Sequence, residues 1–393
     1  MLTGHRAKTA VPFGGRYRVI DFCLSNCVHS DVYETAILAQ YSPKSLIDHI
    51  GMGKPWDLDR KSGGVYILQP THDGEVAKWY LGTADALYQN VDLIRNSKAD
   101  TILVLSGDQV YVMDYRPMIQ YHLEHGTGVT LAMKKVQASQ RSRFGMVRCS
   151  REGFVTAFRE KPAASTFRFA SLGIYLFRRD FLLDNLRPDR ADIVFDVIMP
   201  GLIKREVAGY QFDGYWEDIG SIQSYYRASL RLLKYRSLIT DPDWPIFTKG
   251  SELPPARCAE SSRVTNSIVA DGCIVKGEVG GSILFPGVTV ETGAVVKDSI
   301  VFSFSRIGKD AKVAKTILDK FVVVGSGARI GMDTERRVAC GRAISLAGSG
   351  NGNGGITVIG KHARVSPGAS VRGGGIIESH ARIGKRRGRW QRP

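Results

Sequence analysis

Hydrophobic residues in the first half of the chain alternate between two spacings. The segment Thr101–Leu105 (TILVL) is a short apolar run rich in β-branched residues, which favours a buried strand. Apolar residues at helical spacing precede it in Thr83–Asn96 and follow it in Tyr115–His122. This alternation predicts an α/β domain with a mostly parallel sheet covered by helices. Ligands of such sheets bind beyond the carboxyl ends of the strands, which is where Asp108 falls.

The second half of the chain has a different period, with aliphatic residues recurring every six positions. Gly, Asp or Ser fills many of the turn positions between them. One inward aliphatic residue in six predicts a parallel β-helix, in which each short strand contributes one side chain to a central stack. Ordinary antiparallel strands are the alternative, and they fit five consecutive matches poorly. The members of the series are Val295, Val301, Ile307, Val313, Val324, Ile330, Ile359, Val365, Val371, Ile377 and Ile383.

These two patterns define the predicted domains. Residues 1–237 carry the alternating strands and helices, and residues 257–385 carry the six-residue repeat. Residues 238–256 contain several prolines (DPDWPIFTKGSELPPA) and are interpreted as a linker. Residues 386–393 form a basic tail, which we interpret as a solvated chain end.

Composition narrows the class of protein. The chain has 393 residues, of which 43% are hydrophobic and 23% charged, as in ordinary globular proteins. Its apolar runs are far shorter than the ~20 residues that span a bilayer, and its N-terminus lacks a signal-type apolar stretch. The six cysteines form no CxxC pair, so neither a zinc site nor a disulfide framework is indicated. We expect a cytoplasmic protein without a membrane partner.

The net charge of +16, from 54 Lys and Arg against 38 Asp and Glu, suits an anionic partner. No nucleic-acid-binding motif accompanies the charge. We therefore favour phosphorylated metabolites over nucleic acid.

Two separated carboxylates are the first candidates for chemistry. Asp108 follows the predicted strand in SGDQVYVMDY, and Asp218 lies in YWEDIGS. Such a pair can hold one Mg²⁺ through oxygen ligands, and the metal would neutralise charge in a phosphoryl or nucleotidyl transfer. Taken alone, a Gly-Asp sequence after a strand is more often a simple turn.

Three further motifs each have a functional and a structural interpretation. In WYLGTADA, backbone N–H groups at a helix start can face an anion, or Thr83 can simply cap the helix. In FREKP, Glu160 can accept sugar hydroxyls while Lys161 meets a phosphate, or both can belong to a solvated turn. Arg6 and Lys8 can bind a triphosphate or be surface charge.

In this order, these segments resemble the bacterial glucose-1-phosphate adenylyltransferase family. The resemblance covers about residues 3–332, and its segments include RAKTAVPFGGRYRVIDFCLSNC, WYLGTADAL, SGDQVYVMDY, FREKP, SLGIYLF and YWEDIGS. It implies a Rossmann-like, mostly parallel-sheet nucleotidyltransferase domain followed by a left-handed parallel β-helix. It also implies that ATP and glucose 1-phosphate give ADP-glucose and diphosphate, for glycogen or another α-glucan.

The resemblance further implies roles for single residues. Asp108 and Asp218 match metal-binding aspartates, with Mg²⁺ as the cofactor, and Lys8 matches a lysine at the ATP phosphates. Gly82 and Thr83 lie in the segment that faces the nucleotide. The positions that match the glucose 1-phosphate site are Tyr80, Gly145, Glu160, Lys161 and Ser171. The positions assigned to regulation are Gln40 and Trp79 for communication and Arg6 for the effector. Phosphorylated allosteric effectors and a homotetramer are implied as well.

The sequence departs from the family pattern at its start. The family opens with a strand and a loop of the type LAGGxGTRLxPLT, whereas this sequence begins at Met1 inside the end of that segment. Because the loop cradles the triphosphate with backbone N–H groups, we expect little or no activity without it. Gln109 replaces a common His, and the HDFG motif is not recognisable near Asp192. Two alternatives stay open: another sugar-phosphate nucleotidylyltransferase, and a non-catalytic regulatory subunit or inactive fragment.

Overall fold

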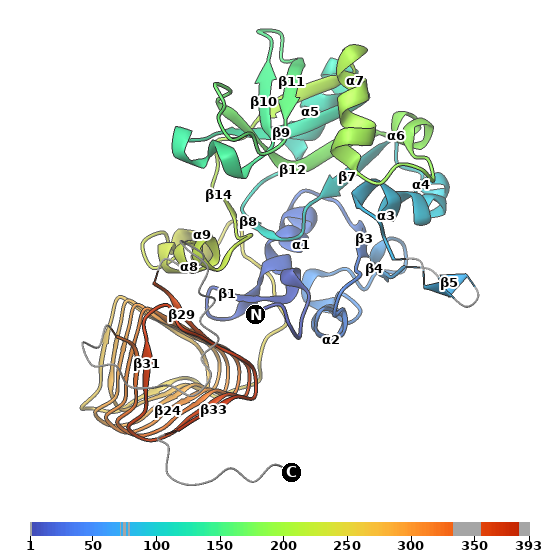
Figure 1. The fold of residues 1–393 in the computed structure, drawn as a ribbon. Helices are drawn as coiled ribbons and strands as arrows, with labels where there is room; N and C mark the ends of the chain where they lie inside the picture. Colours follow the sequence, from blue (N-terminus) through green and yellow to red (C-terminus); the bar gives the residue numbers. More distant parts are fainter. Residues whose placement is uncertain (1, 71, 74–75, 78, 333–354, 385–393) are drawn as a thin grey trace. The chain divides into compact units, whose positions relative to one another are not determined.

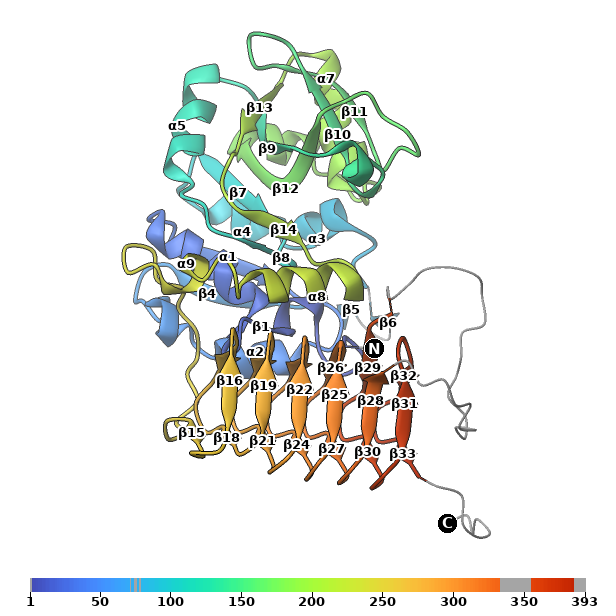
Figure 2. The same cartoon turned by 90° about the vertical axis from the view of Figure 1, so that its left-hand side faces the viewer.

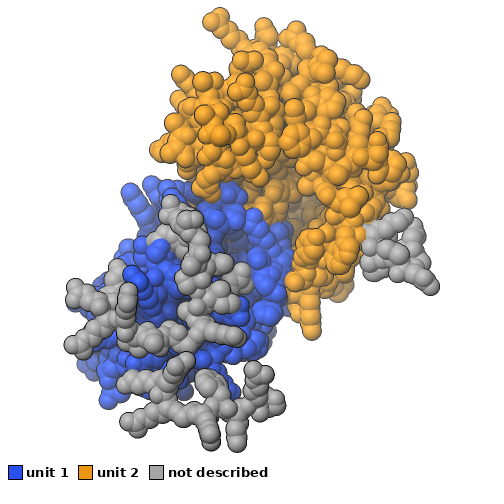
Figure 3. Space-filling view, in the orientation of Figure 1, with its two compact units in different colours: residues 1–21, 217–393 blue, residues 22–216 orange. Residues whose placement is uncertain are grey.

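The chain forms two compact units (Figure 3). The computed structural model describes residues 2–70, 72–73, 76–77, 79–332 and 355–384. Unit 2 comprises Phe22–Trp216, and unit 1 comprises Met1–Asp21 together with Glu217–Pro393. The predicted tail at 386–393 lies outside the described residues, and the predicted domain boundaries stay predictions. In the described part of the chain, no helix has the length and apolar character needed to cross a membrane.

Unit 2 is built on a mixed sheet. The strand order is β11–β10–β12–β9–β13, and β7 pairs with β12 as well. The strands are β7 (Thr101–Leu105), β9 (Val129–Lys135), β10 (Met146–Cys149), β11 (Val155–Arg159), β12 (Phe169–Arg178) and β13 (Val207–Gln211). β7 spans the residues predicted for a strand. β7, β9 and β13 share one direction, as a parallel sheet requires, but β12 runs antiparallel to β7, β9 and β10. The sheet is therefore less parallel than the sequence pattern predicts.

Helices pack against this sheet through apolar side chains that include Val129, Leu131, Phe177 and Phe181. The helices of this part are α1 (Val19–His29), α2 (Lys44–Ile50), η2 (Lys54–Trp56), α3 (Thr83–Gln89), α4 (Val91–Asn96), α5 (Arg116–His125), η3 (Ala138–Arg143), α6 (Arg179–Asn185), the π-helix η4 (Val194–Ile198) and α7 (Met199–Ile203). The remaining strands are β3 (Glu34–Leu38), β4 (Gly64–Leu68), β5 (His72–Asp73), β6 (Val76–Ala77) and β8 (Gln109–Tyr111). β3 and β4 form a separate parallel pair.

The predicted helix over Thr83–Asn96 is divided into α3 and α4 at Asn90. The Asn90 side chain donates a hydrogen bond of 2.8 Å from Nδ2 to the Ala86 carbonyl. Such side chain–backbone bonds compete with the helical pattern, which explains why Asn breaks a helix that the apolar spacing alone favours.

Unit 1 contains a parallel β-helix whose three sheets enclose a central core (Figure 1). The first sheet is β15 (Arg257–Cys258), β18 (Ile274–Val275), β21 (Thr289–Val290), β24 (Arg306–Ile307), β27 (Val323–Val324), β30 (Arg364–Val365) and β33 (Arg382–Ile383). The second is β16 (Arg263–Thr265), β19 (Glu278–Gly280), β22 (Val295–Lys297), β25 (Lys312–Ala314), β28 (Arg329–Met332) and β31 (Ser370–Arg372), and Figure 2 shows these strands side by side. The third is β17 (Ile268–Val269), β20 (Ile283–Leu284), β23 (Ile300–Val301), β26 (Thr316–Leu318), β29 (Thr357–Ile359) and β32 (Ile376–Ile377).

The six-residue spacing identified this β-helix correctly, with one error of register. Val296 is fully buried in the core, whereas the predicted Val295 is only half-buried. The inward series runs Val290, Val296, Val301, Ile307, so the steps are six, five and six residues. One coil therefore takes 17 residues (307 − 290), and a strict period of six drifts by one position per coil.

The N-terminal residues of unit 1 pack onto the β-helix. The additional elements of this unit are η1 (Lys8–Ala10), β1 (Pro12–Phe13), β2 (Tyr17–Arg18), β14 (Trp216–Asp218, which begins in unit 2), α8 (Ile222–Arg231) and α9 (Ser237–Thr240). Gly15, in the turn between β1 and β2, has φ +88°, and a Cβ there would lie 2.7 Å from Ile268. A glycine is thus required both by the left-handed backbone and by the close approach to the coil. Tyr225 of α8 makes edge-on ring contacts with Phe13 of β1 and with Phe302 of the β-helix.

Candidate active site

Asp108 lies in the turn between β7 and β8, at the strand end that the sequence predicts. Ser106 Oγ donates a hydrogen bond of 2.6 Å to Asp108 Oδ1. The Ser106 backbone N–H donates to the Gly173 carbonyl of β12 at 2.9 Å. A half-buried carboxylate held in this way is the kind of oxygen donor that Mg²⁺ prefers.

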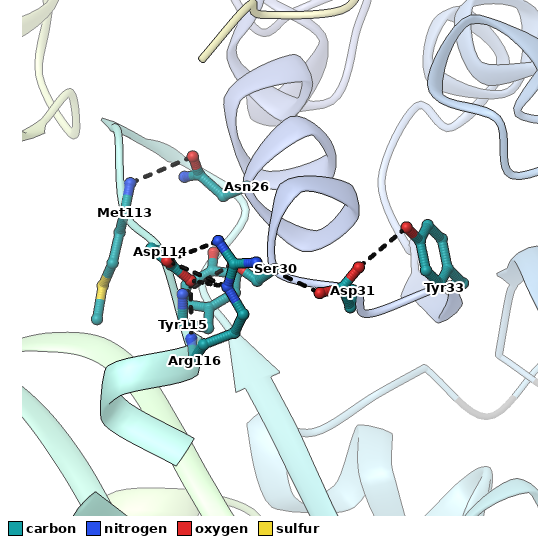
Figure 4. A network of polar contacts seen from close by, with 8 residues as sticks. All are labelled: Asn26, Ser30, Asp31, Tyr33, Met113, Asp114, Tyr115 and Arg116. Atoms are coloured by element: carbon teal, nitrogen blue, oxygen red, sulfur yellow. Dashed lines mark hydrogen bonds and ion pairs between the residues drawn. The ribbon is translucent and has the colours of Figure 1, made fainter. Parts of the chain in front are cut away.

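The segment that follows this turn is attached to α1 by hydrogen bonds from side chains to the backbone (Figure 4). Asn26 Nδ2 donates to the Tyr111 carbonyl at 3.1 Å, and Asn26 Oδ1 accepts the Met113 N–H at 3.2 Å. Ser30 Oγ accepts the Tyr115 N–H at 2.8 Å. Because Asn26 is fully buried, its amide satisfies two backbone groups that water cannot reach. These contacts fix β8 and the segment after it against the helix.

Gln109, the neighbour of Asp108, anchors the other side of the turn. Its Oε1 accepts a hydrogen bond of 2.9 Å from Trp216 Nε1, and both side chains are buried. A buried indole N–H requires an acceptor, and the glutamine amide supplies one. Sequence reasoning noted Gln109 only as a departure and gave no sign of this partner.

The GTADA segment begins α3, and two of its backbone N–H groups are bonded to a neighbouring loop. The Ala191 carbonyl accepts hydrogen bonds from the N–H groups of Ala84 at 2.8 Å and Asp85 at 3.3 Å. Thr83 does not cap the helix, because its Oγ1 accepts the Ile193 N–H at 2.9 Å instead. Gly82 lies so close to this loop that a Cβ would be 2.3 Å from the Ala191 oxygen. The nucleotide-facing roles of Gly82 and Thr83 stay predictions.

Four of the five residues matched to the sugar phosphate come together. The Ser171 N–H donates to the Gly145 carbonyl at 2.8 Å. A Cβ on Gly145 would lie 2.9 Å from Glu160 Oε2, so the carboxylate is close to this glycine. Lys161 Nζ is 3.3 Å from Glu160 Oε1, and the lysine side chain is 66% exposed. An exposed ammonium next to a carboxylate can meet a phosphate while the carboxylate accepts hydroxyls.

Tyr80, the fifth matched residue, contacts the break between α3 and α4. Its hydroxyl accepts a hydrogen bond of 3.1 Å from Asn90 Nδ2. Burial raises the pKa of Tyr80, so the hydroxyl stays protonated at neutral pH.

Tyr175 lies next to Ser171 and Glu160, and sequence reasoning did not single it out. Burial raises the pKa of Tyr175 to about 12; the Glu160 and Asp192 carboxylates add to the rise, and the nearby Ser171 hydroxyl opposes it. β12 is irregular between Ser171 and Tyr175, where three residues of β12 lie opposite one residue of β9. No local sequence signal marks this bulge except Gly173, whose φ is +67°.

Trp79, one of the two positions assigned to communication, contacts the residue that follows the other, Gln40. Gln40 is half-buried just after β3. The adjacent Tyr41 stacks on Trp79 with ring centroids 5.5 Å apart and an interplanar angle of 12°. Both rings are largely exposed. The regulatory role itself stays a prediction.

The remaining predicted residues belong to unit 1. Lys8 begins η1, and Asp218 ends β14. Since Asp108 belongs to unit 2, a metal site shared by Asp108 and Asp218 stays a prediction. In the described residues, no group of three or more His, Cys, Asp or Glu could hold a metal. A Mg²⁺ ion on two carboxylates would take its other oxygens from phosphates and water.

Arg6, the predicted effector contact, is buried within unit 1. Its Nη2 is 2.7 Å from Asp319 Oδ1, and the side chains are 4% and 2% exposed. The guanidinium carbon lies 5.8 Å from the centroid of the Phe302 ring. Arg6 therefore holds the N-terminal segment to the β-helix, a role that its position in the sequence did not suggest.

Comparison with known proteins extends this picture. The Nucleotidyl transferase family profile matches residues 1–235, and the GlmU-like, C-terminal hexapeptide profile matches residues 254–345. The second match fits the predicted left-handed β-helix. The chain is 46% identical over 381 residues to the glucose-1-phosphate adenylyltransferase of Thermomicrobium roseum, covering 94% of this chain and 88% of that protein. It is 39% identical to that of Bacillus thuringiensis (84% and 90% covered) and 40% identical to that of Fervidobacterium nodosum (84% and 82% covered).

Proposed function

The chain belongs to the glucose-1-phosphate adenylyltransferase family, and we propose that it transfers the adenylyl group of ATP to glucose 1-phosphate. A phosphate oxygen of the sugar phosphate attacks the α-phosphorus of ATP. The bond from that phosphorus to the bridging oxygen breaks, and ADP-glucose and diphosphate result. The observation that carries the proposal is the 46% identity over almost the whole chain, joined to the grouping of Gly145, Glu160 and Ser171.

The protein's part in this reaction is to position two anions and to balance their charge. No covalent intermediate is needed, so orientation and electrostatic stabilisation account for the acceleration. Glu160 accepts hydrogen bonds from sugar hydroxyls, and Lys161 next to it binds the sugar phosphate. The side chain of Lys161 is 66% exposed and that of Glu160 is 34% exposed, which supports this division because a phosphate must approach from solvent.

A divalent metal is general for nucleotidyl transfer, and we propose Mg²⁺. Asp108 fits this ion, because its carboxylate is half-buried and is oriented by a hydrogen bond from the Ser106 hydroxyl. Asp218 would supply the second carboxylate, and Lys8 would neutralise the triphosphate. When bound, the metal supplies positive charge at the phosphate oxygens.

The direct test is product formation with a substrate panel. The purified chain is incubated with Mg²⁺, glucose 1-phosphate and each of ATP, GTP, UTP and dTTP, and nucleotide sugars are separated by chromatography. We expect ADP-glucose as the main product and a rate lower by several orders of magnitude in Asp108→Asn. The matched control is Asp92→Asn, since Asp92 is an exposed carboxylate on α4 in a surface pair with Arg95. Preference for another nucleotide would contradict the proposal, and no product with any nucleotide would favour the inactive-fragment alternative.

We also propose that phosphorylated metabolites regulate the enzyme through unit 1. Burial, together with the positive charges of Arg18 and Arg6, lowers the pKa of Lys320 to about 8. Crowded cations of this kind are stabilised by a bound anion. We expect glycolytic phosphates to change the rate or the apparent KM, Lys320→Gln to weaken their binding, and Trp79→Ala to reduce the response. If no glycolytic phosphate changes the kinetics, this proposal fails.

The homotetramer that the resemblance implies is part of the same proposal. Light scattering coupled to size-exclusion chromatography measures it directly, because a 43.2 kDa chain gives four times that mass as a tetramer. A monomeric or dimeric mass would contradict it.

A further inference from the structure

Ser106 stands two residues before Asp108 and contacts its carboxylate directly. The distance from Ser106 Oγ to Asp108 Oδ1 is 2.6 Å, in the range of hydroxyl-to-carboxylate bonds strengthened by the negative charge. We propose that Ser106 is a positioning residue that sets the plane of the Asp108 carboxylate for a divalent metal. This inference rests on the proposed function, in which Asp108 binds the metal.

The position of Ser106 is itself fixed by β12. Its backbone N–H donates to the Gly173 carbonyl at 2.9 Å. Gly173 has φ +67°, and a Cβ there would lie 3.1 Å from Ser106 Cβ and 3.2 Å from Gln109 Nε2. The bulge in β12 thus places the Gly173 backbone close to both Ser106 and Gln109. As a result, the position of Ser106 is fixed, and the hydrogen bond from its hydroxyl restricts the rotation of the Asp108 carboxylate.

Partners that orient a metal ligand affect metal affinity strongly. Loss of such a contact generally weakens metal binding about 10- to 100-fold. A hydrogen bond from Ser to a carboxylate two residues on is also a common local turn contact, so the bond alone does not establish the role. The chain contains a similar contact that can serve as a control: Ser150 Oγ donates to Glu152 Oε2 over 3.3 Å in an exposed turn. That pair has the same spacing but lies away from the predicted metal site.

The test measures metal binding separately from turnover. Mn²⁺ is titrated into protein saturated with ADP-glucose, and free Mn²⁺ is followed by its electron paramagnetic resonance signal. We expect Ser106→Ala to weaken Mn²⁺ binding about 10- to 100-fold, and Ser106→Thr, which keeps the hydroxyl, to bind within about threefold of the parent. Ser150→Ala should bind like the parent. The apparent KM for glucose 1-phosphate should change less than twofold in Ser106→Ala.

Two outcomes would overturn the inference. One is a Ser106→Ala protein that binds Mn²⁺ like the parent while Asp108→Asn does not, since Asp108 would then bind metal without help. The other is a parallel rise in the Mn²⁺ dissociation constant and the sugar phosphate KM with a lowered melting temperature, which would indicate a purely structural role. If Asp108→Asn also binds Mn²⁺ normally, the proposed function loses its metal ligand, which is a different failure.

Discussion

The buried ion pair between Arg6 and Asp319 allows a quantitative prediction. We consider Arg6→Met, which keeps much of the side-chain volume and removes the charge. The Asp319 carboxylate would retain the Lys320 N–H, which donates to its Oδ1 at 2.7 Å, but would lose the guanidinium at the same distance. With 2% of its side chain exposed, the carboxylate cannot recover hydration in place of its partner.

The magnitude follows from the burial of both partners. Removing one member of a buried pair costs about 3–5 kcal/mol, because the other charge is left uncompensated. In a unit of roughly 150–250 residues, each kcal/mol shifts the midpoint of thermal unfolding by about 2–4 °C. We therefore expect the midpoint to fall by roughly 6–20 °C. The double variant Arg6→Met with Asp319→Leu should be more stable than either single variant, because neither charge then remains buried.

The assay is thermal unfolding followed by circular dichroism, with all four proteins of the double-mutant cycle measured at one pH and salt concentration. Arg306→Met is the matched control in the same unit. Its partner Glu291 lies at 2.7 Å, but the Arg306 side chain is 64% exposed, so we expect a cost of about 0–1 kcal/mol. The reasoning is refuted if Arg6→Met costs no more than the control. It is also refuted if the double variant loses the sum of the two single effects.

Three further predictions concern unit 2. Lys161→Ala should raise the KM for glucose 1-phosphate about ten- to a hundredfold, the equivalent of roughly 1.5–3 kcal/mol for a charge-assisted contact, with little change for ATP; equal effects on both substrates would show a structural role. Burial, and then Arg178, lower the pKa of His122 from 6.5, so the folded protein binds this proton less readily than the unfolded chain. Stability should therefore be complete above pH 6.5 and fall as the pH drops below it, and melting curves from pH 7 to pH 5 should show a smaller loss in His122→Gln. Gly173→Ala should cost about 1–3 kcal/mol, because its left-handed backbone and the Ser106 contact at 3.1 Å both disfavour a Cβ; an unchanged melting temperature would contradict this.

Sequence reasoning predicted the parts of the fold that repeat or that depend on local pattern. β7 was predicted over its whole length, because its residues form a short apolar run rich in β-branched side chains, although all five are half-buried in the structure rather than fully buried. The β-helix was predicted because each strand contributes one aliphatic residue to the core. The error at Val295 has a physical cause: a coil of 17 residues has three sides, which cannot all be six residues long.

The parts that sequence reasoning missed depend on contacts between distant residues. Thr83 is a good N-cap by type, yet its hydroxyl serves Ile193, 110 positions later. Arg6 looks like a free cation in RAK, yet Asp319 lies 313 positions away and pairs with it. Both side chains have a plausible local role, but the folded chain provides each with a partner that is distant in sequence, and that partner is the one bound in the structure.

In the turns of the β-helix, contacts between coils again override the local preference of the backbone. Phe304, Phe321, His362 and His380 all have φ between +60° and +63°, a region that costs an ordinary residue about 1–2 kcal/mol and predicts glycine. Their rings stack along the coils with centroids 5.5, 4.8 and 4.9 Å apart. Parallel coils place equivalent turns one above another, so the left-handed backbone aims each ring at the next, and the stacking offsets part of the local cost. In a repeating fold, side chains at equivalent turn positions thus contact one another from coil to coil, as the inward aliphatic residues do. Aromatic residues at a regular turn spacing therefore indicate a stack even where glycine is expected.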